Sequence, residues 1–342
     1  MENKTKLRLL YLYQHLLQYT DAEHKLTPQL IEILNKQYGI EVNRNTLAND
    51  FKMLEQAVVK FEVVHSQQNQ YYYDGRVFDL AELKIMIDAI SSSKFITEKK
   101  SRDLIEKVLS LTTEHNATSL RRHVHVEGRV KSENERGYYI VDTINEAIDG
   151  GYKIKFQYAD YSTKKRKVVR HGGEYYVVSP YSLVWDGDYY YVIGYSEMRG
   201  KVQNFRLDRI FRLPETLPNE PIIPAPHGFN LAEYSREVFR MFGTDKPVHV
   251  QLLCKNYIMN AIVDKFGTRI PVEEVDEDHF KIDPLVCPSP TLLRWVFGWN
   301  GDMKILGPEN VREDYKAMCR KGLENSLEKF TLHDIFETCS EF

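Results

Sequence analysis

The segment NRNTLANDFKMLEQ, residues 43–56, carries amide and basic side chains at a spacing that suits DNA binding. Asn45, Asn49 and Lys52 recur four and three residues apart, so they share one face of a helix. Asparagine amides hydrogen-bond base edges in the major groove, and lysine or arginine side chains bind phosphates. We therefore take these three residues, together with Arg44 at the start of the helix, as candidate DNA-binding residues.

A second segment, residues 151–210, combines basic side chains with aromatic rings. It holds eleven Lys or Arg residues against six Asp or Glu residues, and ten of the chain's 22 tyrosines. On the predicted strand KIKFQY, Lys153 and Lys155 alternate with Ile154 and Phe156. Such strands supply the phosphate contacts and stacking surfaces that single-stranded nucleic acid or a nucleotide needs. The alternative is a solvent-exposed barrel face over a tyrosine-rich core, and we assign most of the tyrosines to that core.

Arg206 and Arg209 form a candidate guanidinium pair for an anion. Residues three apart on a regular strand point to opposite faces, so the pair requires a bulge or a strand end between them. The alternative is that Arg209 pairs with a nearby carboxylate such as Asp186. We explain Asp186 and Asp188 by a type I′ hairpin turn at Asp-Gly, in preference to paired catalytic carboxylates.

The common catalytic and cofactor motifs are absent from the sequence. It contains no GxxxxGK[ST], no GxGxxG after a strand, no HExxH and no GxSxG. His123 and His125 have no carboxylate or cysteine at a ligand-like spacing, so we interpret them as part of an exposed strand. The four cysteines are widely spaced and form no CxxC pair. We expect no catalytic activity, no cofactor and no metal.

Three helices and a hairpin are expected to position the DNA-binding residues. The helical spacing of Leu7, Leu10 and Leu17 predicts a first helix over residues 5–18. A second helix ends at Gly39, the segment described above forms the third, and two short strands follow it. This order predicts a winged helix-turn-helix. Residues 1–75 carry eight basic against nine acidic residues, so a merely solvated helix face is the alternative.

Length and composition favour a soluble protein of two or three domains. The chain has 342 residues, 42% of them apolar, with a mean hydropathy of -0.46 and a net charge of -3. Because no apolar run approaches the roughly 18 residues that span a bilayer, we expect a cytoplasmic protein. The predicted fold class is α+β and multidomain. The predicted divisions are a winged helix-turn-helix at 1–78, a helical connector at 79–137, a small β-barrel at 138–215, a Pro-rich linker at 216–245, a C-terminal α+β domain at 246–330 and a tail at 331–342.

The strand-rich segment, from GYKIKFQYADY to VQNFRLDRI, resembles the WYL domain, a small Sm-like barrel of bacterial transcription regulators. The Trp-Tyr-Leu of the family name falls at Tyr190-Tyr191-Val192, and the downstream arginine motif falls at residues 205–210. The C-terminal stretch LLRWVFGWNGDMKILGPENVREDY is similar to the extension usual after this domain.

The front of the chain is similar to the winged helix of the same family. The pattern R-x-T-x-x-x-D-x-x-x-L matches at Arg44, Thr46, Asp50 and Leu54. One departure is Asn49, where many members have arginine, and it lowers the positive charge of the helix. The resemblance adds Thr46 to the DNA-binding candidates, and Lys155, Tyr158, Tyr190 and Tyr191 to Arg206 and Arg209 as ligand-binding candidates.

The resemblance implies a DNA-binding regulator, usually a homodimer, whose barrel senses nucleic acid or a nucleotide. We therefore expect a ligand-responsive transcription regulator whose partners are duplex DNA, such an effector and a second copy of the chain, with no membrane partner. One alternative is an accessory nucleic-acid-binding protein of repair or phage defence that does not regulate specific sequences. The other is a nucleotide-processing enzyme, for which the sequence offers no base, nucleophile or metal cluster.

Overall fold

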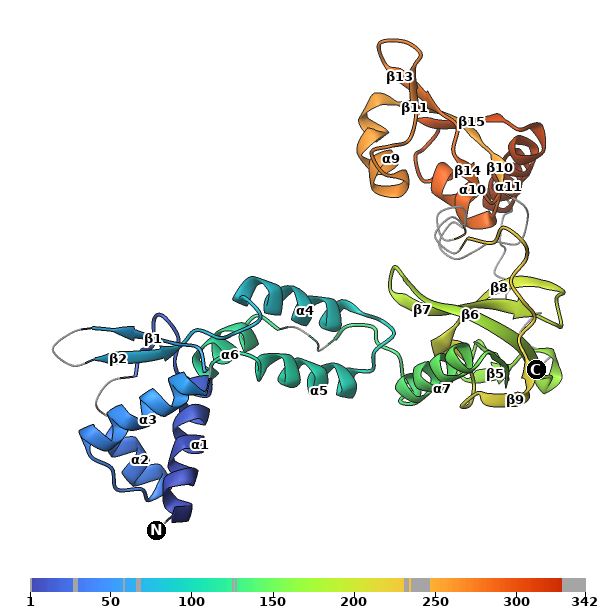
Figure 1. The fold of residues 1–342 in the computed structure, drawn as a ribbon. Coiled ribbons are helices and arrows are strands. Elements are labelled where there is room, and N and C mark those ends of the chain that lie inside the picture. The colour runs from blue at the N-terminus through green and yellow to red at the C-terminus, as the bar shows by residue number, and fades with distance from the viewer. Residues whose placement is uncertain are drawn as a thin grey trace. The chain divides into compact units, whose positions relative to one another are not determined.

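The chain folds into two compact units, residues 1–137 and 138–342, which are described separately (Figure 1). The computed structural model describes residues 2–26, 30–57, 59–65, 69–124, 126, 128–230, 234 and 247–327. Within these ranges, no helix has both the length and the apolar character needed to cross a membrane. The structure contains both helices and sheets, as the predicted α+β class requires.

The first unit begins with three helices and a two-stranded antiparallel hairpin. These are α1 (Glu2–Tyr19), α2 (Leu30–Tyr38), α3 (Arg44–Gln56), β1 (Phe61–Val64) and β2 (Gln70–Tyr73). Leu26, between α1 and α2, forms an additional bridge with Tyr71 of β2. Three helices followed by a hairpin is the element order that the sequence analysis expects for this region.

The core of this region comes from all three helices and packs under the hairpin. Leu47, Phe51 and Leu54 of α3 are buried, at the spacing that keeps them on one helix face. They pack with buried leucines of α1 and α2 and with partly buried aromatic residues of the hairpin; the buried leucines include Leu12, Leu16 and Leu34. The Phe51 and Tyr71 rings stack with their centroids 3.7 Å apart.

The first helix has leucines on both its buried and its exposed sides. Leu12 and Leu16 are fully buried, whereas Leu7 and Leu10 are 44% and 58% exposed. Both sets occur at helical spacing, because the segment is apolar on more than one side. The prediction of a helix is therefore confirmed, and its core side chains are Leu12 and Leu16.

Three further helices complete the first unit. They are α4 (Leu80–Ser92), α5 (Glu98–Leu109) and α6 (Glu114–Arg121). α5 ends at Leu109, and α6 begins after Thr113, whose hydroxyl accepts the Asn116 N–H and caps the new helix. Asp21 accepts the Thr113 hydroxyl and the Asn116 amide, each at 3.1 Å, and so joins α6 to the segment after α1.

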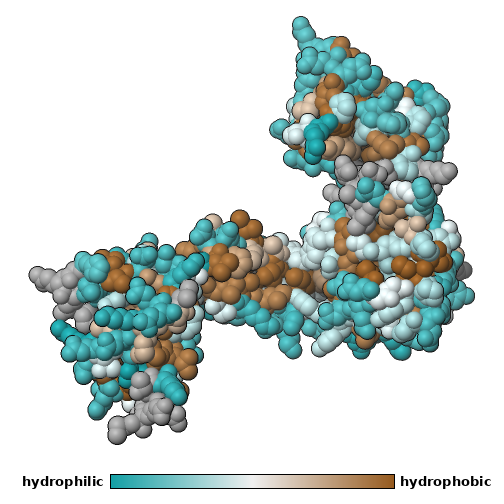
Figure 2. Space-filling model, viewed as in Figure 1, coloured by the Kyte–Doolittle hydropathy of each residue, from teal (hydrophilic) through white to brown (hydrophobic). Residues whose placement is uncertain are grey.

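The surface of this connector retains apolar side chains. Val77 and Ile85, beside and on α4, are 85% and 68% exposed, and Figure 2 shows hydrophobic residues gathered over the connector helices. His123 lies in the turn that follows α6, so the exposed strand predicted there does not include it. His125 lies outside the described residues.

The second unit starts with α7 (Gly137–Gly150) and a five-stranded antiparallel sheet. The strands of this sheet are β3 (Tyr152–Phe156), β6 (Tyr176–Asp186), β7 (Tyr189–Ser196), β8 (Lys201–Arg206) and β9 (Glu215–Pro221), in the order β8-β7-β6-β3-β9. A hairpin, β4 (Ala159–Tyr161) and β5 (Lys167–Val169), leaves the sheet after β3. A single bridge between Tyr158 and Ile210 joins this excursion to the residues after β8.

Two local features of this sheet differ from the sequence-based expectation. β9 falls within the stretch interpreted as a linker, and it pairs with β3, so the sheet extends six residues beyond the predicted boundary at 215. The β6–β7 turn consists of Gly187 and Asp188, and positive φ occurs at Gly187 but not at Asp188. A glycine with positive φ at the first central position alone is typical of a type II′ turn, not of the predicted type I′.

The C-terminal part of the second unit is a βαββαβ arrangement with an added helix. β11 (Gln251–Lys255) leads through α9 (Met259–Phe266) to β12 (Val272–Glu274) and β13 (His279–Ile282). α10 (Pro290–Phe297), β15 (Met303–Gly307) and α11 (Glu309–Leu327) follow, and β10 (Val248–His249) pairs with β14 (Leu285–Val286). The sheet order is β12-β13-β11-β15.

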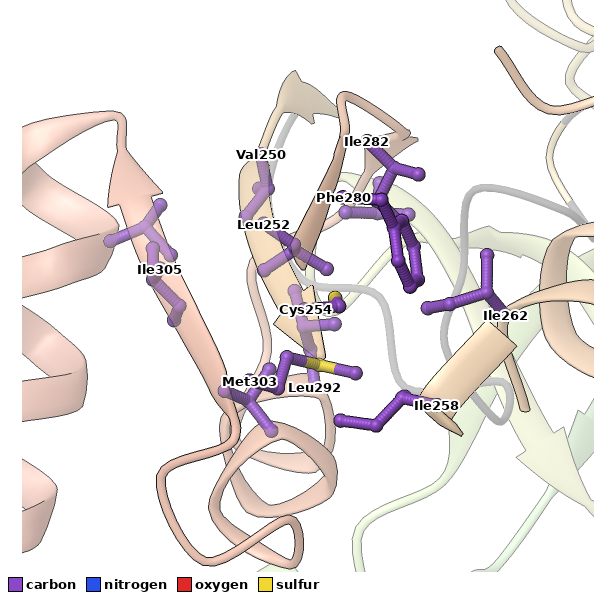
Figure 3. Packing of buried hydrophobic residues seen from close by; sticks show 13 residues of the cluster. Val250, Leu252, Cys254, Ile258, Ile262, Phe280, Ile282, Leu292, Met303 and Ile305 are labelled. Atoms are coloured by element: carbon purple, nitrogen blue, oxygen red, sulfur yellow. The ribbon is translucent and has the colours of Figure 1, made fainter. Parts of the chain in front are cut away.

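The core of this C-terminal part lies between its sheet and its helices. Figure 3 shows Leu252 and Cys254 of β11 beside Phe280 of β13, with Ile262 of α9 and Leu292 of α10 facing them. All five side chains are at most 2% exposed. Ser289 caps α10 by accepting the Leu292 N–H, with Pro290 in the first turn, as the sequence SPTLL favours.

Candidate nucleic-acid sites

The start of α3 is held by a side-chain cap. Asn43 Oδ1 accepts the backbone N–H of Thr46 and also its hydroxyl, each at 2.9 Å. These bonds satisfy one of the free N–H groups of the first turn and fix the point where the helix begins. The Thr46 hydroxyl is therefore engaged in the cap, and its side chain is half-buried beside the exposed Arg44 and Asn45.

A buried ion pair fixes α3 against α1. Asp50 is fully buried and accepts two hydrogen bonds from the Arg8 guanidinium, one of them at 2.9 Å from Nη2 to Oδ1. The hydrogen bond to Asp50 raises the pKa of Arg8. This bidentate geometry fixes the rotation of α3 about its own axis, which determines the side chains that face outward.

The outward face of α3 carries the predicted residues. Asn45, Asn49 and Lys52 are exposed along one face, and Arg44 is exposed at the helix start. Leu47, on the opposite face, is buried. The fold therefore brings the five predicted DNA-binding residues to one end and one side of a single helix, four of them exposed.

A cavity of about 270 Å³ lies in the five-stranded sheet of the second unit. Four arginines, four aromatic residues and two amide side chains line it, namely Arg170, Arg199, Arg206, Arg209, Tyr158, Tyr176, Tyr191, Phe205, Gln203 and Asn204. Tyr158, Tyr176 and Phe205 belong to an aromatic cluster of the core, with ring centroids 5.4–6.0 Å apart.

Arg206 and Arg209 line the same cavity because the strand ends between them. β8 ends at Arg206, and residues Leu207–Arg209 form a single 3₁₀ turn. That turn cancels the alternation that would have placed the two side chains on opposite faces. The strand end that the sequence analysis requires for this pair is present.

Two carboxylates hold three of the guanidinium groups. Asp208 accepts two hydrogen bonds from Arg206, at 3.1 and 2.8 Å, and the Arg206 guanidinium carbon lies 3.3 Å from the centroid of the Tyr189 ring. Burial opposes the charge of Arg206, but the pair with Asp208 prevails and raises its pKa. The planar group is thus fixed on one side by an ion pair and on one face by a ring.

Asp160 is shared by Arg170 and Arg209. It accepts two hydrogen bonds from Arg170, and a weaker contact of 3.4 Å from Arg209. The hydrogen bond from Arg170 lowers the pKa of Asp160, so this carboxylate is ionised at neutral pH. The carboxylate that pairs with Arg209 is therefore Asp160 on β4, not Asp186.

Tyr158 connects the aromatic core to the arginine cluster. Its hydroxyl accepts the backbone N–H of Arg206 at 3.0 Å, at the point where β8 ends. Burial raises the pKa of Tyr158 to about 12 and also raises that of Tyr191. Both phenols are therefore neutral at physiological pH.

A comparison of the sequence with family models matches residues 139–214 to the WYL domain. The chain contains a WYL domain. The match covers α7 from Tyr139, the whole β3–β8 region and the arginine cluster, and it confirms the resemblance stated from the sequence motifs. Among curated proteins, no sequence matches the chain.

Two solved structures are similar to the chain at low identity. Proteasome accessory factor B/C (PafBC) of Arthrobacter aurescens matches 94% of this chain at 16% identity and a TM-score of 0.30. This chain spans about half of that one, 49% of its length. A CRISPR Cas-related protein matches 75% of this chain and 76% of its own at 15% identity and a TM-score of 0.37.

Two predicted ligand-binding residues of the WYL domain do not line the cavity. Lys155 forms an ion pair with Glu215 at 3.1 Å and lies 5.0 Å from the Tyr175 ring centroid. Tyr190 pairs across the strands with Trp185, with ring centroids 5.5 Å apart, because neighbours on β7 alternate between faces and Tyr191 faces the cavity. Of the six candidates, the remaining four line it.

Six cavity residues of the WYL domain were not singled out from the sequence: Arg170, Tyr176, Arg199, Gln203, Asn204 and Phe205. Phe205 belongs to the arginine motif, and alternation along β8 relates it to Gln203. Arg170 follows β5, and its position depends on the Asp160 pair across the hairpin. Arg199 lies in the β7–β8 turn, where strand alternation predicts no direction.

Proposed function

We propose that this protein is a cytoplasmic, ligand-responsive transcription regulator without catalytic activity. Its winged helix would bind duplex DNA, and its WYL domain would bind a nucleotide or single-stranded nucleic acid. The observation that carries this proposal is the WYL cavity, where four arginines surround aromatic rings. At the level of the whole domain, the WYL match indicates a nucleic-acid-responsive regulator.

The cavity has the components that a nucleotide requires. Arginine guanidinium groups bind phosphate oxygens in pairs of parallel hydrogen bonds, and tyrosine or phenylalanine rings stack on bases. Arg206 is held in place by Asp208 and Tyr189 before any ligand arrives, so little entropy is lost when it binds. Lys164, Lys165 and Arg166, exposed in the β4–β5 turn, add positive charge to the same domain.

The DNA-binding step follows from the exposed face of α3. In a dimer, two copies of α3 would enter successive major grooves, with Asn45 and Asn49 at base edges. Arg44 and Lys52 would contact phosphates, which position the helix without reading sequence. Ligand binding would change DNA affinity only if the two dimer states bind the ligand with different affinities.

The test is to capture genomic DNA fragments on the purified protein and sequence them. Wild type should enrich a shared palindromic motif, and Asn49→Ala/Lys52→Ala should lose it. Lys99→Ala, at an exposed lysine of α5, is the control and should retain the motif. Enrichment of the same motif by the double variant would overturn the assignment of α3 as the reading helix.

A second candidate function is an accessory nucleic-acid-binding protein. It is favoured by the low charge of the winged helix, because Arg8 is engaged with the buried Asp50, and Arg44 and Lys52 are the exposed basic residues of α3. Under this alternative, DNA affinity would fall steeply with salt and show no preference among duplex sequences. Retention of single strands only would support it.

A further inference from the structure

The WYL cavity has arginines at both ends of β8. Arg206 is the last residue of the strand, and Arg170 and Arg209 line the cavity at the same end. Arg199 lies in the turn before Lys201, where β8 begins. At roughly 3.3 Å per residue, the two ends of this six-residue strand are about 17 Å apart.

The arginines at the Arg206 end cannot move along the strand to join Arg199. Asp208 and the Tyr189 ring hold Arg206, and Asp160 holds Arg170. Arg199 is exposed, and within the described part of the chain its guanidinium has no carboxylate partner. It is therefore free to contact a ligand group at its own end of the cavity.

The charges divide into two similar sites. At the Arg206 end, three guanidinium groups face two carboxylates, Asp160 and Asp208, which leaves one net positive charge. At the other end, Arg199 contributes one further positive charge. The half-buried Tyr191 and the amide side chains of Gln203 and Asn204 also line the cavity, whereas the rings of Tyr158, Tyr176 and Phe205 are at most 6% exposed.

We propose that the WYL cavity binds two phosphodiester groups of one strand, the first at the Arg206 end and the second at Arg199, with the intervening nucleoside beside Tyr191. This inference rests on the proposed function, because it specifies the ligand of the same cavity. A single net positive charge at each end matches the single negative charge of a phosphodiester. Arg199 is then the residue that makes the site select an oligonucleotide over a ligand with one phosphate.

The experiment measures binding of two thymidine oligonucleotides to the full-length protein by calorimetry or fluorescence anisotropy. TpT has one phosphodiester, and TpTpT has two. Wild type should bind TpTpT about tenfold more tightly, since one charge-assisted contact is added. Arg199→Ala should lower the affinity for TpTpT to that for TpT and leave TpT unchanged, and Arg199→Lys should restore part of the difference.

Controls and salt dependence separate a contact from a structural effect. Arg212→Ala, at an exposed arginine outside the cavity, should leave both affinities unchanged, and Arg206→Ala should weaken both ligands. For wild type, the slope of log affinity against log salt should be steeper for TpTpT by about 0.7, and Arg199→Ala should remove that increment.

The outcomes distinguish this inference from the proposed function. If wild type binds neither oligonucleotide, the proposed nucleic-acid ligand of the WYL domain is wrong. If wild type binds both but Arg199→Ala changes neither the affinity nor the salt slope, the second phosphate site is wrong and the proposed function stands. Equal weakening of TpT and TpTpT by Arg199→Ala would mean that both ends hold one phosphate, which also overturns the inference.

Discussion

At the scale of single residues, the WYL cavity shows how carboxylates and a tyrosine hold arginine side chains and backbone in place. Asp160 and Asp208 hold Arg170 and Arg206 in defined positions, and the Tyr158 hydroxyl fixes the backbone where β8 ends. Each carboxylate reduces the positive charge of the site but also reduces the entropy that its arginine loses on binding. Neutral tyrosines complete the lining.

Arg206→Ala should weaken oligonucleotide binding about 10- to 100-fold, because a preorganised charge-assisted contact is lost. Lys155→Ala is the matched comparison, since Lys155 pairs with Glu215 and does not line the cavity. We expect it to change the affinity less than threefold, about 0.6 kcal/mol. A titration of both variants by fluorescence anisotropy checks this, and a larger loss in Lys155→Ala would place the ligand elsewhere on the sheet.

Tyr158 should make the second unit sensitive to alkali. Burial raises its folded-state pKa to about 12, whereas an unfolded tyrosine ionises near its ordinary value of 10. The contribution of the neutral Tyr158 phenol to the free energy of unfolding is therefore complete below pH 10, and it is lost as the pH rises from 10 to 12. Tyr158→Phe should cost about 1–3 kcal/mol at pH 8, because the Arg206 N–H loses its acceptor, and the difference from wild type should shrink by pH 12.

Denaturant unfolding at pH 8, 10 and 12 measures this difference. Tyr234, whose pKa burial also raises to about 12, contributes the same pH dependence to both proteins, so the comparison isolates Tyr158. A gap between wild type and Tyr158→Phe that stays constant over this range would show that the Tyr158 phenol does not titrate there.

At the scale of elements, close contact between β6 and β7 requires a residue without a side chain at position 194. A Cβ built on Gly194 would lie 2.5 Å from the Ser179 carbonyl oxygen and 2.8 Å from a Val178 methyl carbon. Gly194→Ala should therefore destabilise the second unit by about 1–3 kcal/mol, as overpacking does. Gly322→Ala is the control, because it lies in α11 with open space around it and should stabilise by about 0.5–1 kcal/mol. Thermal unfolding measures the stability of both variants. If Gly194→Ala unfolds at the same temperature as wild type, β6 and β7 can move apart to accommodate the methyl group at little cost.

The ion pair between α1 and α3 should determine whether α3 keeps its orientation. Arg8→Ala leaves the buried Asp50 carboxylate without its partner and should cost about 3–5 kcal/mol. Arg8→Met/Asp50→Leu removes both charges and should restore most of that stability. Urea unfolding followed by circular dichroism measures both variants. If Arg8→Ala matches wild type in stability, the pair does not hold α3.

At the scale of the whole molecule, the proposed regulator must couple an anion site in one unit to a DNA-binding helix in the other. Coupling of this kind is reciprocal, so an effector that changes DNA affinity by a given factor has its own affinity changed by DNA equally. A chain with two compact units provides the two sites, and a difference in ligand affinity between two dimer states would provide the coupling.

Arg206→Ala/Arg209→Ala should bind operator DNA like wild type without effector, but the effector should no longer change its DNA affinity. Titration of a fluorescent operator fragment with and without TpTpT measures this coupling. Asn49→Ala/Lys52→Ala provides the opposite comparison and should lose DNA binding while retaining TpTpT binding. An unchanged effector response in the arginine variant would exclude the cavity as the sensor.

Most of the local structure of this protein could be predicted from the sequence alone. The spacing of Leu47, Phe51 and Leu54 predicts a helix with one buried face, and alternation in KIKFQY predicts β3, because these periodicities depend only on backbone geometry. The arginine motif of residues 205–210 identifies the WYL domain and requires a strand end between its arginines. The positions of the five candidate DNA-binding residues on α3 follow from the same short-range regularities.

Only the tertiary structure decided which side chains meet in the cavity. Residue type does not distinguish Tyr190 from Tyr191, because both are tyrosines. The register of β7 against β6 and β8 places Tyr191, and not Tyr190, in the lining of the cavity. Arg209 finds Asp160, 49 residues away, because the β4–β5 hairpin folds back beside β8, and Arg199 enters the cavity from a turn. Such contacts depend on strand pairing and loop direction across long sequence separations, which no local periodicity encodes.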